Sequence, residues 1–400
     1  MKNKYVVTIA TILAGVFLMF LCTKVFFKKN TDNLLKVGFV YIGDAGTAYT
    51  NNFIRAQIEL EDQFDDKVQT IAKYNITERK CENALRDLVN QGCKLIFTTN
   101  YDYSRTTKLI AAEFPGVQFC QASGDNASSE PFLPNYHNFM GTIYEGKYVS
   151  GVVAGMKLLD LIRQGKLSRN KAKLGYVAAF PYAEVISGYT AFFLGVRSIV
   201  PEATMTVRYT NTWSNYIIEK KIANRLIFED DCVIISQHTD TTGPAIACEE
   251  ASIKGGKTVF HVGYNQGMTD VAPTTSLISC RINWNPYIIA AATAVLKNKN
   301  IESVAKTTLG PNDSGAGFNH GWIELIGLNQ LIATHDIQKE IQYNIRQFKN
   351  GEIKVFSGSY IGENPFNKND IWDLKNPFPE NETRSAPSFC YVLRDVIEIK

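Results

Sequence analysis

The sequence lacks the short motifs that mark most enzymes. It contains no G-x-S-x-G turn, no P-loop and no H-E-x-x-H pair. Gly315-Ala316-Gly317 does not follow a predicted strand in a β-α-β unit, so dinucleotide binding is not indicated. His238 and Asp240 resemble an acid–base pair, but no nucleophile stands beside them. We therefore predict that the protein is not an enzyme and uses no cofactor.

A strong charge of one sign is also absent. The 42 Lys and Arg residues nearly balance the 39 Asp and Glu residues, so nucleic acid is not an expected partner. The eight cysteines form no C-x-x-C pair and no metal-ligand spacing, which argues against a metal site. Several, such as Cys120 and Cys280, lie within apolar runs, so we predict buried free thiols.

The first residues form the longest uncharged stretch. Tyr5–Thr23 carries no charge, has lysines on both sides, and is long enough to span a bilayer. It is an uncleaved anchor, a lipoprotein signal with Cys22 as the lipidated residue, or an ordinary cleaved signal. Leu21 is larger than the residue that usually precedes such a cysteine, which disfavours the second alternative. All three export the chain, so we expect residues 1–33 to be a signal or membrane anchor with a tether, and the rest to be extracytoplasmic.

After the tether, short apolar runs recur at the spacing of βα units. They begin near residues 36, 68, 94 and 117, and again near 173, 204, 232 and 258. Two such sets predict an α/β fold with two doubly wound parallel-sheet lobes. We assign residues 34–143 plus about 265–310 to lobe 1, and 144–264 plus about 311–360 to lobe 2. Residues 361–400 are expected to wrap over the surface, with Phe389–Ile399 adding an edge strand, and Lys354–Phe356 is predicted to be a short strand.

Aromatic residues stand beside amides, hydroxyls or carboxylates where the predicted strands end. Open α/β sheets bind ligands at these ends, so two facing lobes would form a hinged cleft. Aromatic faces can stack on a flat ring, and carboxylates can accept hydrogen bonds from sugar hydroxyls. The candidate ligand-binding residues are Asp44, Tyr49, Asn100, Tyr101, Phe180, Glu184, Trp213, His238, Asp240, Tyr264, Asn265 and Trp284.

Several of these candidates also have explanations that involve no ligand. Asp240 could be the N-cap of a helix beginning at Thr241. Glu184 falls in the first turn of a predicted helix, where it would offset the helix dipole. His238 could hydrogen-bond a neighbouring carbonyl, and Trp284 could serve only as packing between the lobes.

Longer stretches resemble a known family. IYEGKYVSGVVAGM, GYVAAFPYAEVISGYTAFFLGVRSIVPEAT, VRYTNTW, IISQHTD and GYNQGM resemble the basic membrane protein family of ABC-transporter substrate-binding lipoproteins, and the match covers about Lys36–Phe356. The resemblance implies a type I periplasmic-binding-protein fold, two lobes joined by three crossovers. It also implies a small-molecule ligand, a purine nucleoside or base, and an ABC permease as partner. We expect a monomer. The alternative is a ligand-sensing ectodomain of the same fold that signals through a membrane partner.

Two positions depart from the family pattern. The first loop matches at Gly43, Asp44 and Gly46, but Thr47 stands where the family usually has an aromatic, so Tyr49 is expected to take over stacking. Asn265 stands where the family usually has an aspartate on the ribose hydroxyls. An amide is a weaker acceptor than a carboxylate, so a free base or another heterocycle becomes the more plausible ligand.

Overall fold

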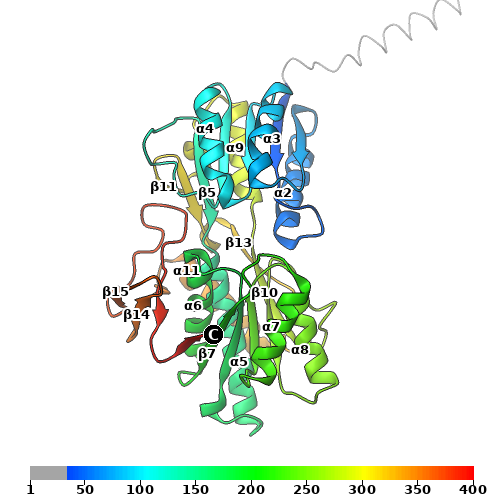
Figure 1. Cartoon of the computed structure of the whole chain (residues 1–400), viewed down its shortest axis with the longest axis vertical. Coiled ribbons are helices and arrows are strands. Elements are labelled where there is room, and N and C mark those ends of the chain that lie inside the picture. The colour runs from blue at the N-terminus through cyan, green and yellow to red at the C-terminus, as the bar shows by residue number, and fades with distance from the viewer. Residues whose placement is uncertain (1–33) are drawn as a thin grey trace, which may run out of the picture.

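The computed structural model describes residues 34–400, which form two α/β lobes stacked along the long axis (Figure 1). The expected anchor and tether at residues 1–33, and Cys22 with them, lie outside the described residues. Within residues 34–400, no helix has both the length and the apolar character needed to cross a membrane.

Lobe 1 contains a seven-stranded sheet in the order β11-β12-β5-β4-β3-β1-β2. Two of its interior strands, β1 (Leu35–Val40) and β3 (Leu95–Thr98), are short, mostly apolar runs because helices cover both faces of the sheet. Strands in chain order are β1 (Leu35–Val40), β2 (Val68–Lys73), β3 (Leu95–Thr98), β4 (Gln118–Ala122), β5 (Tyr136–Gly141), the antiparallel edge β11 (Thr308–Gly310) and β12 (Asp313–Ala316). Its helices are α2 (Ala48–Phe64), α3 (Glu78–Asn90), α4 (Ser104–Glu113), α9 (Asn285–Leu296) and α10 (Ile301–Ala305).

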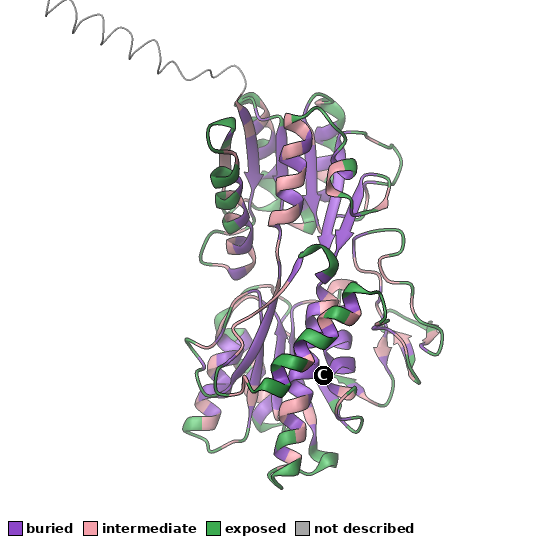
Figure 2. Cartoon of the chain, turned by 180° about the vertical axis from the view of Figure 1, so that it is seen from behind, coloured by how far each residue is buried: buried purple, intermediate pink, exposed green. Residues whose placement is uncertain are grey.

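Lobe 2 repeats this architecture with the order β13-β10-β9-β8-β6-β7-β17. Figure 2 shows buried strands inside both lobes, with helices exposing only their outer sides. Strands are β6 (Lys173–Ala178), β7 (Thr204–Tyr209), β8 (Ile234–His238), β9 (Phe260–Tyr264), β10 (Ser276–Ile282), the antiparallel β13 (Ile323–Ile326) and β17 (Ile397–Ile399). Its helices are α5 (Ile143–Arg163), α6 (Ala183–Arg197), α7 (Tyr216–Phe228), α8 (Gly243–Ile253) and α11 (His335–Lys349).

Helices α5 and α6 cross at unusually close range. A Cβ added at Gly151 would lie 2.1 Å from the carbonyl oxygen of Phe192, and one at Gly195 would lie 2.1 Å from that of Tyr148. No side chain fits at either position, so glycine is required there. This close crossing buries α5 within lobe 2.

Three crossovers join the lobes, as the family resemblance implied: they follow β5, β10 and β12. Two are tied together by Glu145, whose carboxylate accepts hydrogen bonds from the backbone N–H of Phe318 (2.8 Å) and the hydroxyl of Thr142 (2.9 Å). The third crossover, after β10, is held by a hydrogen bond from the N–H of Asn283 to the carbonyl of Trp322 (2.7 Å).

The expected lobe boundaries are wrong in two places. Strand β10 belongs to the sheet of lobe 2, because it pairs in parallel with β9, and the chain returns to lobe 1 only after Ile282. Strand β12 belongs to lobe 1, because it pairs with β5. Lys354–Phe356 is not a strand: Phe356 instead stacks on Phe389, with ring centroids 4.1 Å apart.

The C-terminal tail does more than wrap over the surface. β14 (Ile361–Asn364), β15 (Asn367–Asp373) and β16 (Val392–Leu393) form a small sheet, and β17 extends lobe 2 by pairing in parallel with β7. The predicted edge strand is thus confirmed. The N–H of Ser385 also reaches lobe 1, where it lies 3.2 Å from each carboxylate oxygen of Asp313. The tail therefore contacts both lobes.

The cysteine prediction is confirmed for the described residues. Cys81, Cys93, Cys120, Cys232, Cys248 and Cys280 are buried free thiols, and Cys390 is a half-buried one. Burial raises the pKa of the Cys120 and Cys280 thiols, so they stay protonated at neutral pH.

Candidate ligand-binding cleft

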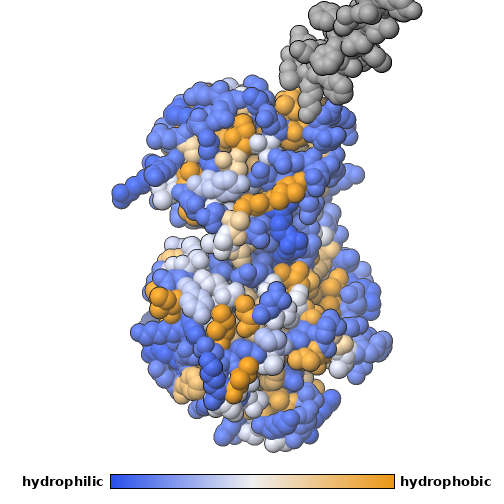
Figure 3. All heavy atoms as spheres, turned by 90° about the vertical axis from the view of Figure 1, so that its right-hand side faces the viewer, coloured by the Kyte–Doolittle hydropathy of each residue, from blue (hydrophilic) through white to orange (hydrophobic). Residues whose placement is uncertain are grey.

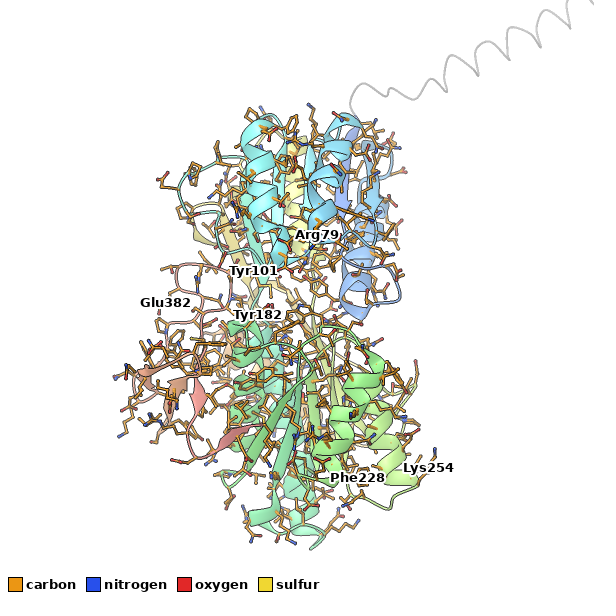
Figure 4. The ribbon with its side chains drawn as sticks, viewed as in Figure 1. Arg79, Tyr101, Tyr182, Phe228, Lys254 and Glu382 are labelled. Carbon is orange, nitrogen blue, oxygen red and sulfur yellow. The ribbon has the colours of Figure 1, made fainter. Side chains whose placement is uncertain are left out.

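A cavity of about 290 Å³ lies between the lobes, at the carboxyl ends of the strands of both sheets. Figure 3 shows the narrow waist at this level, and Figure 4 places Tyr101 above and Tyr182 below the boundary between the lobes. The volume is near the lower limit of ligand sites, which are typically about 300–1,000 Å³. The cleft therefore suits a small molecule.

The structure brings most of the predicted site residues together around this cavity. Tyr49, Asn100 and Tyr101 line it from lobe 1, and Glu184, Trp213, Asp240, Tyr264 and Asn265 line it from lobe 2. They come from loops, the first turns of helices and strand ends, but they share one edge of each parallel sheet, as the strand-end argument expects.

Two of the remaining candidates lie directly behind the cleft wall. His238 ends β8 and is fully buried, with its ring centroid 4.5 Å from that of Tyr264 and its Nε2 3.5 Å from Glu184 Oε1. Neither ring nitrogen has a hydrogen-bond partner, so the expected bond to a carbonyl does not form. Burial lowers the pKa of His238, which keeps the ring neutral. Phe180 meets Trp213 edge to face, with centroids 5.4 Å apart, and so fixes the indole.

Asp44 and Trp284 lie away from the cavity lining. Asp44 is exposed, and its carboxylate accepts hydrogen bonds from the N–H of Gly46 (2.9 Å) and the amide of Asn75 (3.1 Å). Trp284 is buried in lobe 1, where it stacks on Phe53 with centroids 4.3 Å apart. Its role in the structure is packing within lobe 1 rather than between the lobes. It touches the cleft only through the edge of Tyr49, 6.2 Å between centroids.

The lobe 1 wall presents two tyrosines. Tyr49 lies in the first turn of α2, and its hydroxyl donates to the carbonyl of Thr99 at 2.7 Å, which fixes the ring. Burial, reinforced by the negative charge of Glu184, raises the pKa of Tyr49, so the phenol stays protonated. Tyr101 is half-exposed at the cleft mouth, with its hydroxyl 3.3 Å from Asp125.

Asp240 is the principal polar group of the lobe 2 wall. Its Oδ1 accepts a hydrogen bond from the Asn265 amide at 2.8 Å, and its N–H donates to the carbonyl of Trp213 at 3.0 Å. Burial raises the pKa of Asp240 to about 7, and the charges of Glu219 and Glu184 act in the same direction. The expected N-cap role is wrong, because α8 begins at Gly243 with Thr242 as its N-cap.

Asn265 joins the two lobes and Asp240. Its backbone φ is +63°, a left-handed conformation that asparagine tolerates. The amide of Asn52, on α2 of lobe 1, donates toward the backbone carbonyl of Asn265 (3.1 Å) and toward its Oδ1 (3.3 Å). Since the Asn265 amide also donates to Asp240, both ends of its side chain are engaged within the protein.

The lining residues carry negative charge without positive charge. The carboxylates are Asp102, Glu184 and Asp240, and no lysine or arginine is among the residues that line the cleft. A phosphate or carboxylate ligand would meet repulsion there, whereas a neutral ring rich in N–H groups would find acceptors. Within residues 34–400, no group of His, Cys, Asp and Glu is arranged to hold a metal ion.

Other lining residues were missed by the sequence argument: Thr47, Thr50, Asp102, Ser123 and Ser214. All lie at or next to a recognised strand end, so the strand-end argument placed them near the cleft without singling them out. Lys147, buried beneath Tyr264, was also missed. It shares a helix face with Ile143 and Gly151. A charged residue on a buried helix face was therefore the sequence signal that could have identified it.

Known proteins resemble this chain in sequence and in fold. Residues 42–356 match the Bmp family, described as ABC transporter substrate-binding protein PnrA-like. The chain is 30% identical over 335 residues to a purine-binding protein of Brucella abortus, covering 82% of this chain and 85% of that one. It is 26% identical over 332 residues to a putative ABC transporter glucose-binding protein of Haloferax volcanii, covering 82% and 75%.

Among solved structures, a solute-binding protein of an ABC transporter system from Aeropyrum pernix matches with a TM-score of 0.63 and 13% identity, over 80% of this chain and 92% of that chain. A counterpart from Conexibacter woesei matches with a TM-score of 0.60 and 16% identity, over 80% and 97%. These likenesses confirm the two-lobe fold. With the family match over most of the chain, they lead to one conclusion: this protein belongs to the PnrA-like (Bmp) family of ABC transporter substrate-binding proteins, which are binding proteins rather than enzymes.

Proposed function

We propose that this protein is the extracytoplasmic receptor of an ABC importer and that it closes as a monomer on a purine base or nucleoside. The observation that carries the proposal is the cleft itself. Tyr49, Tyr101, Trp213 and Tyr264 offer aromatic surface, and Asp240 offers an acceptor for ring N–H groups. The similarity to a purine-binding protein of Brucella abortus supports the same ligand class. We expect the segment before residue 34 to tether the receptor to the membrane, beside its permease.

A free base fits this cleft better than a nucleoside. Asn265 occupies the position where the family usually has a ribose-binding aspartate, and its amide is already bonded to Asp240 and Asn52. A ribose would therefore lack a free carboxylate acceptor, and the small cavity volume favours the smaller ligand.

Calorimetry with adenine, hypoxanthine, adenosine, inosine, guanosine and glucose tests this proposal. We expect binding heat from at least one purine, tighter binding of bases than of their nucleosides, and no heat from glucose. If none of the purines binds, the ligand class is wrong. If glucose alone binds, the cleft serves a sugar, as the name of the Haloferax relative suggests for that protein.

The affinity for a neutral purine should depend on pH. Because the pKa of Asp240 is raised to about 7, its carboxylate form dominates above that pH, and the ionised fraction falls as the pH drops below it. A ligand that donates an N–H to the carboxylate should lose about tenfold in affinity per pH unit below 7. Calorimetry with hypoxanthine between pH 5.5 and 8 measures this dependence. A flat profile would contradict the role given to Asp240.

A second function is ligand sensing through a membrane partner. One observation favours it: the chain is also 22% identical over 297 residues to a Bacillus subtilis protein named a transcriptional activator, covering 70% of this chain and 81% of that one. Loss of purine uptake after deletion of the gene supports the importer. Unchanged uptake with a lost transcriptional response to purines supports sensing.

A further inference from the structure

Lys147 on α5 is buried directly behind the cleft wall. It has no exposed surface, and its ammonium donates to the backbone carbonyl of Gln237 at 2.7 Å. The ammonium also lies 4.0 Å from the centroid of the Tyr264 ring and 5.7 Å from that of Tyr176. Because Tyr264 lines the cavity, this positive charge is separated from the ligand space by one aromatic ring.

A buried ammonium needs compensation, since removing a charge from water is costly. No carboxylate of the described residues lies within 4.0 Å of it, so it forms no direct ion pair there. The groups that favour its charged form from a longer distance are the buried Cys280 and two residues of the cleft lining, Asp240 and Glu184. Burial lowers the pKa of Lys147 to about 8, so the charge is still present at neutral pH.

The charged and titratable surroundings of Asp240 show what this charge does. The groups coupled to Asp240 by charge are Glu219 from α7, Glu184 from α6, Lys147 from α5, Tyr264 at the end of β9 and Tyr49 from α2, and Asn265 after β9 is hydrogen-bonded to it. The two glutamates disfavour a second negative charge, and the Asn265 amide favours it by donating a hydrogen bond. Lys147 is the cation of this set.

We propose that Lys147 is a positioning residue for ligand binding: its ammonium braces Tyr264 from behind and supplies the positive charge that lets Asp240 serve as an ionised acceptor. A merely structural lysine would act through its hydrogen bond to Gln237 alone. Lys147→Gln separates these roles, because glutamine keeps an N–H donor at the end of its side chain but carries no charge. Lys147→Arg keeps the charge.

The first test uses the ligand-free protein and does not rest on the proposed function. Carbon-13 NMR of aspartate-labelled protein follows the Asp240 carboxyl, which is identified by its loss in Asp240→Asn. We expect the titration midpoint to rise by about half a pH unit to one unit in Lys147→Gln, because removing an opposite charge disfavours the ionised carboxyl. We expect it to stay within about 0.3 units in Lys147→Arg. An unchanged midpoint in Lys147→Gln overturns the proposal. Should that variant not fold, a large shift in the charge-retaining Lys147→Arg overturns it instead.

The second test measures hypoxanthine affinity against pH and rests on the proposed purine ligand. Lys147→Gln should bind about two- to fivefold more weakly at pH 7, and the loss should shrink at pH 8 and above, where Asp240 ionises even without its partner. A loss that is the same at every pH indicates a structural role only and overturns the proposal. If the wild type binds no purine, the proposed function fails, while the NMR result still decides the role of Lys147.

Lys108→Met is a matched control. Lys108 is another buried lysine, but it lies in lobe 1, where its ammonium donates to the carbonyls of Asn126 (2.7 Å) and Ser129 (2.8 Å). Its replacement should lower the stability of lobe 1. It should leave both the midpoint and the shape of the Asp240 titration curve unchanged. A shift as large as that of Lys147→Gln would show that the midpoint reports general loosening, which also overturns the proposal.

Discussion

Replacing Asp240 with alanine is expected to weaken purine binding by about thirtyfold or more, since truncating one partner of a buried charged hydrogen-bonded set costs about 2–5 kcal/mol. The carboxylate faces the cavity, and it also orients Asn265, which in turn contacts Asn52 across the lobes. The alanine variant therefore loses both the ligand acceptor and the group that holds Asn265. Calorimetry with the best-binding purine measures the loss.

Asp102→Ala provides the control for this prediction. Asp102 also lines the cleft with a carboxylate, but it is exposed and its charge is screened by solvent. We expect its removal to change the affinity by no more than a few fold. Equal losses in the two variants would show that the cleft responds only to total negative charge, and a small loss in Asp240→Ala would refute the acceptor role.

Replacing Trp284 with alanine should affect stability far more than binding. The indole is buried, stacks on Phe53 and contacts the edge of Phe139, so its loss leaves a cavity in the core of lobe 1. Large-to-small changes of this kind cost about 3–5 kcal/mol of unfolding free energy. Urea denaturation measures this cost, and calorimetry on the folded fraction should give an affinity within a few fold of the wild type.

Trp213→Ala should behave in the opposite way. Trp213 is only partly buried and lines the cleft, so it should lose about 1–3 kcal/mol of stacking with the base and little stability. If Trp284→Ala instead abolished ligand binding while the variant protein kept its stability, then Trp284 would be a ligand-binding residue. The cleft that holds the ligand would then differ from the one described.

The architecture of both lobes was predictable because it depends on local patterns. Buried parallel strands are short, nearly continuous apolar runs, and βα units have a narrow range of lengths, so runs such as Leu35–Val40 and Leu95–Thr98 could be recognised one at a time. The edge strand near Ile397 was also expected. The membership of β10 was not predictable, because any short strand can join either sheet, and its pairing with β9 is a long-range contact.

The sequence by itself determined which side chains stand at the strand ends, and therefore that Tyr49, Trp213 and Asp240 would meet near one cleft. Only the tertiary structure decided which way each side chain points and what stands behind it. Trp284 turns into lobe 1 because Phe53 provides a stacking partner there, and Lys147 reaches the cleft wall from a helix that the sequence marks only as buried. Orientation and charge compensation depend on neighbours far away in the chain, and these neighbours meet only after the two sheets have formed.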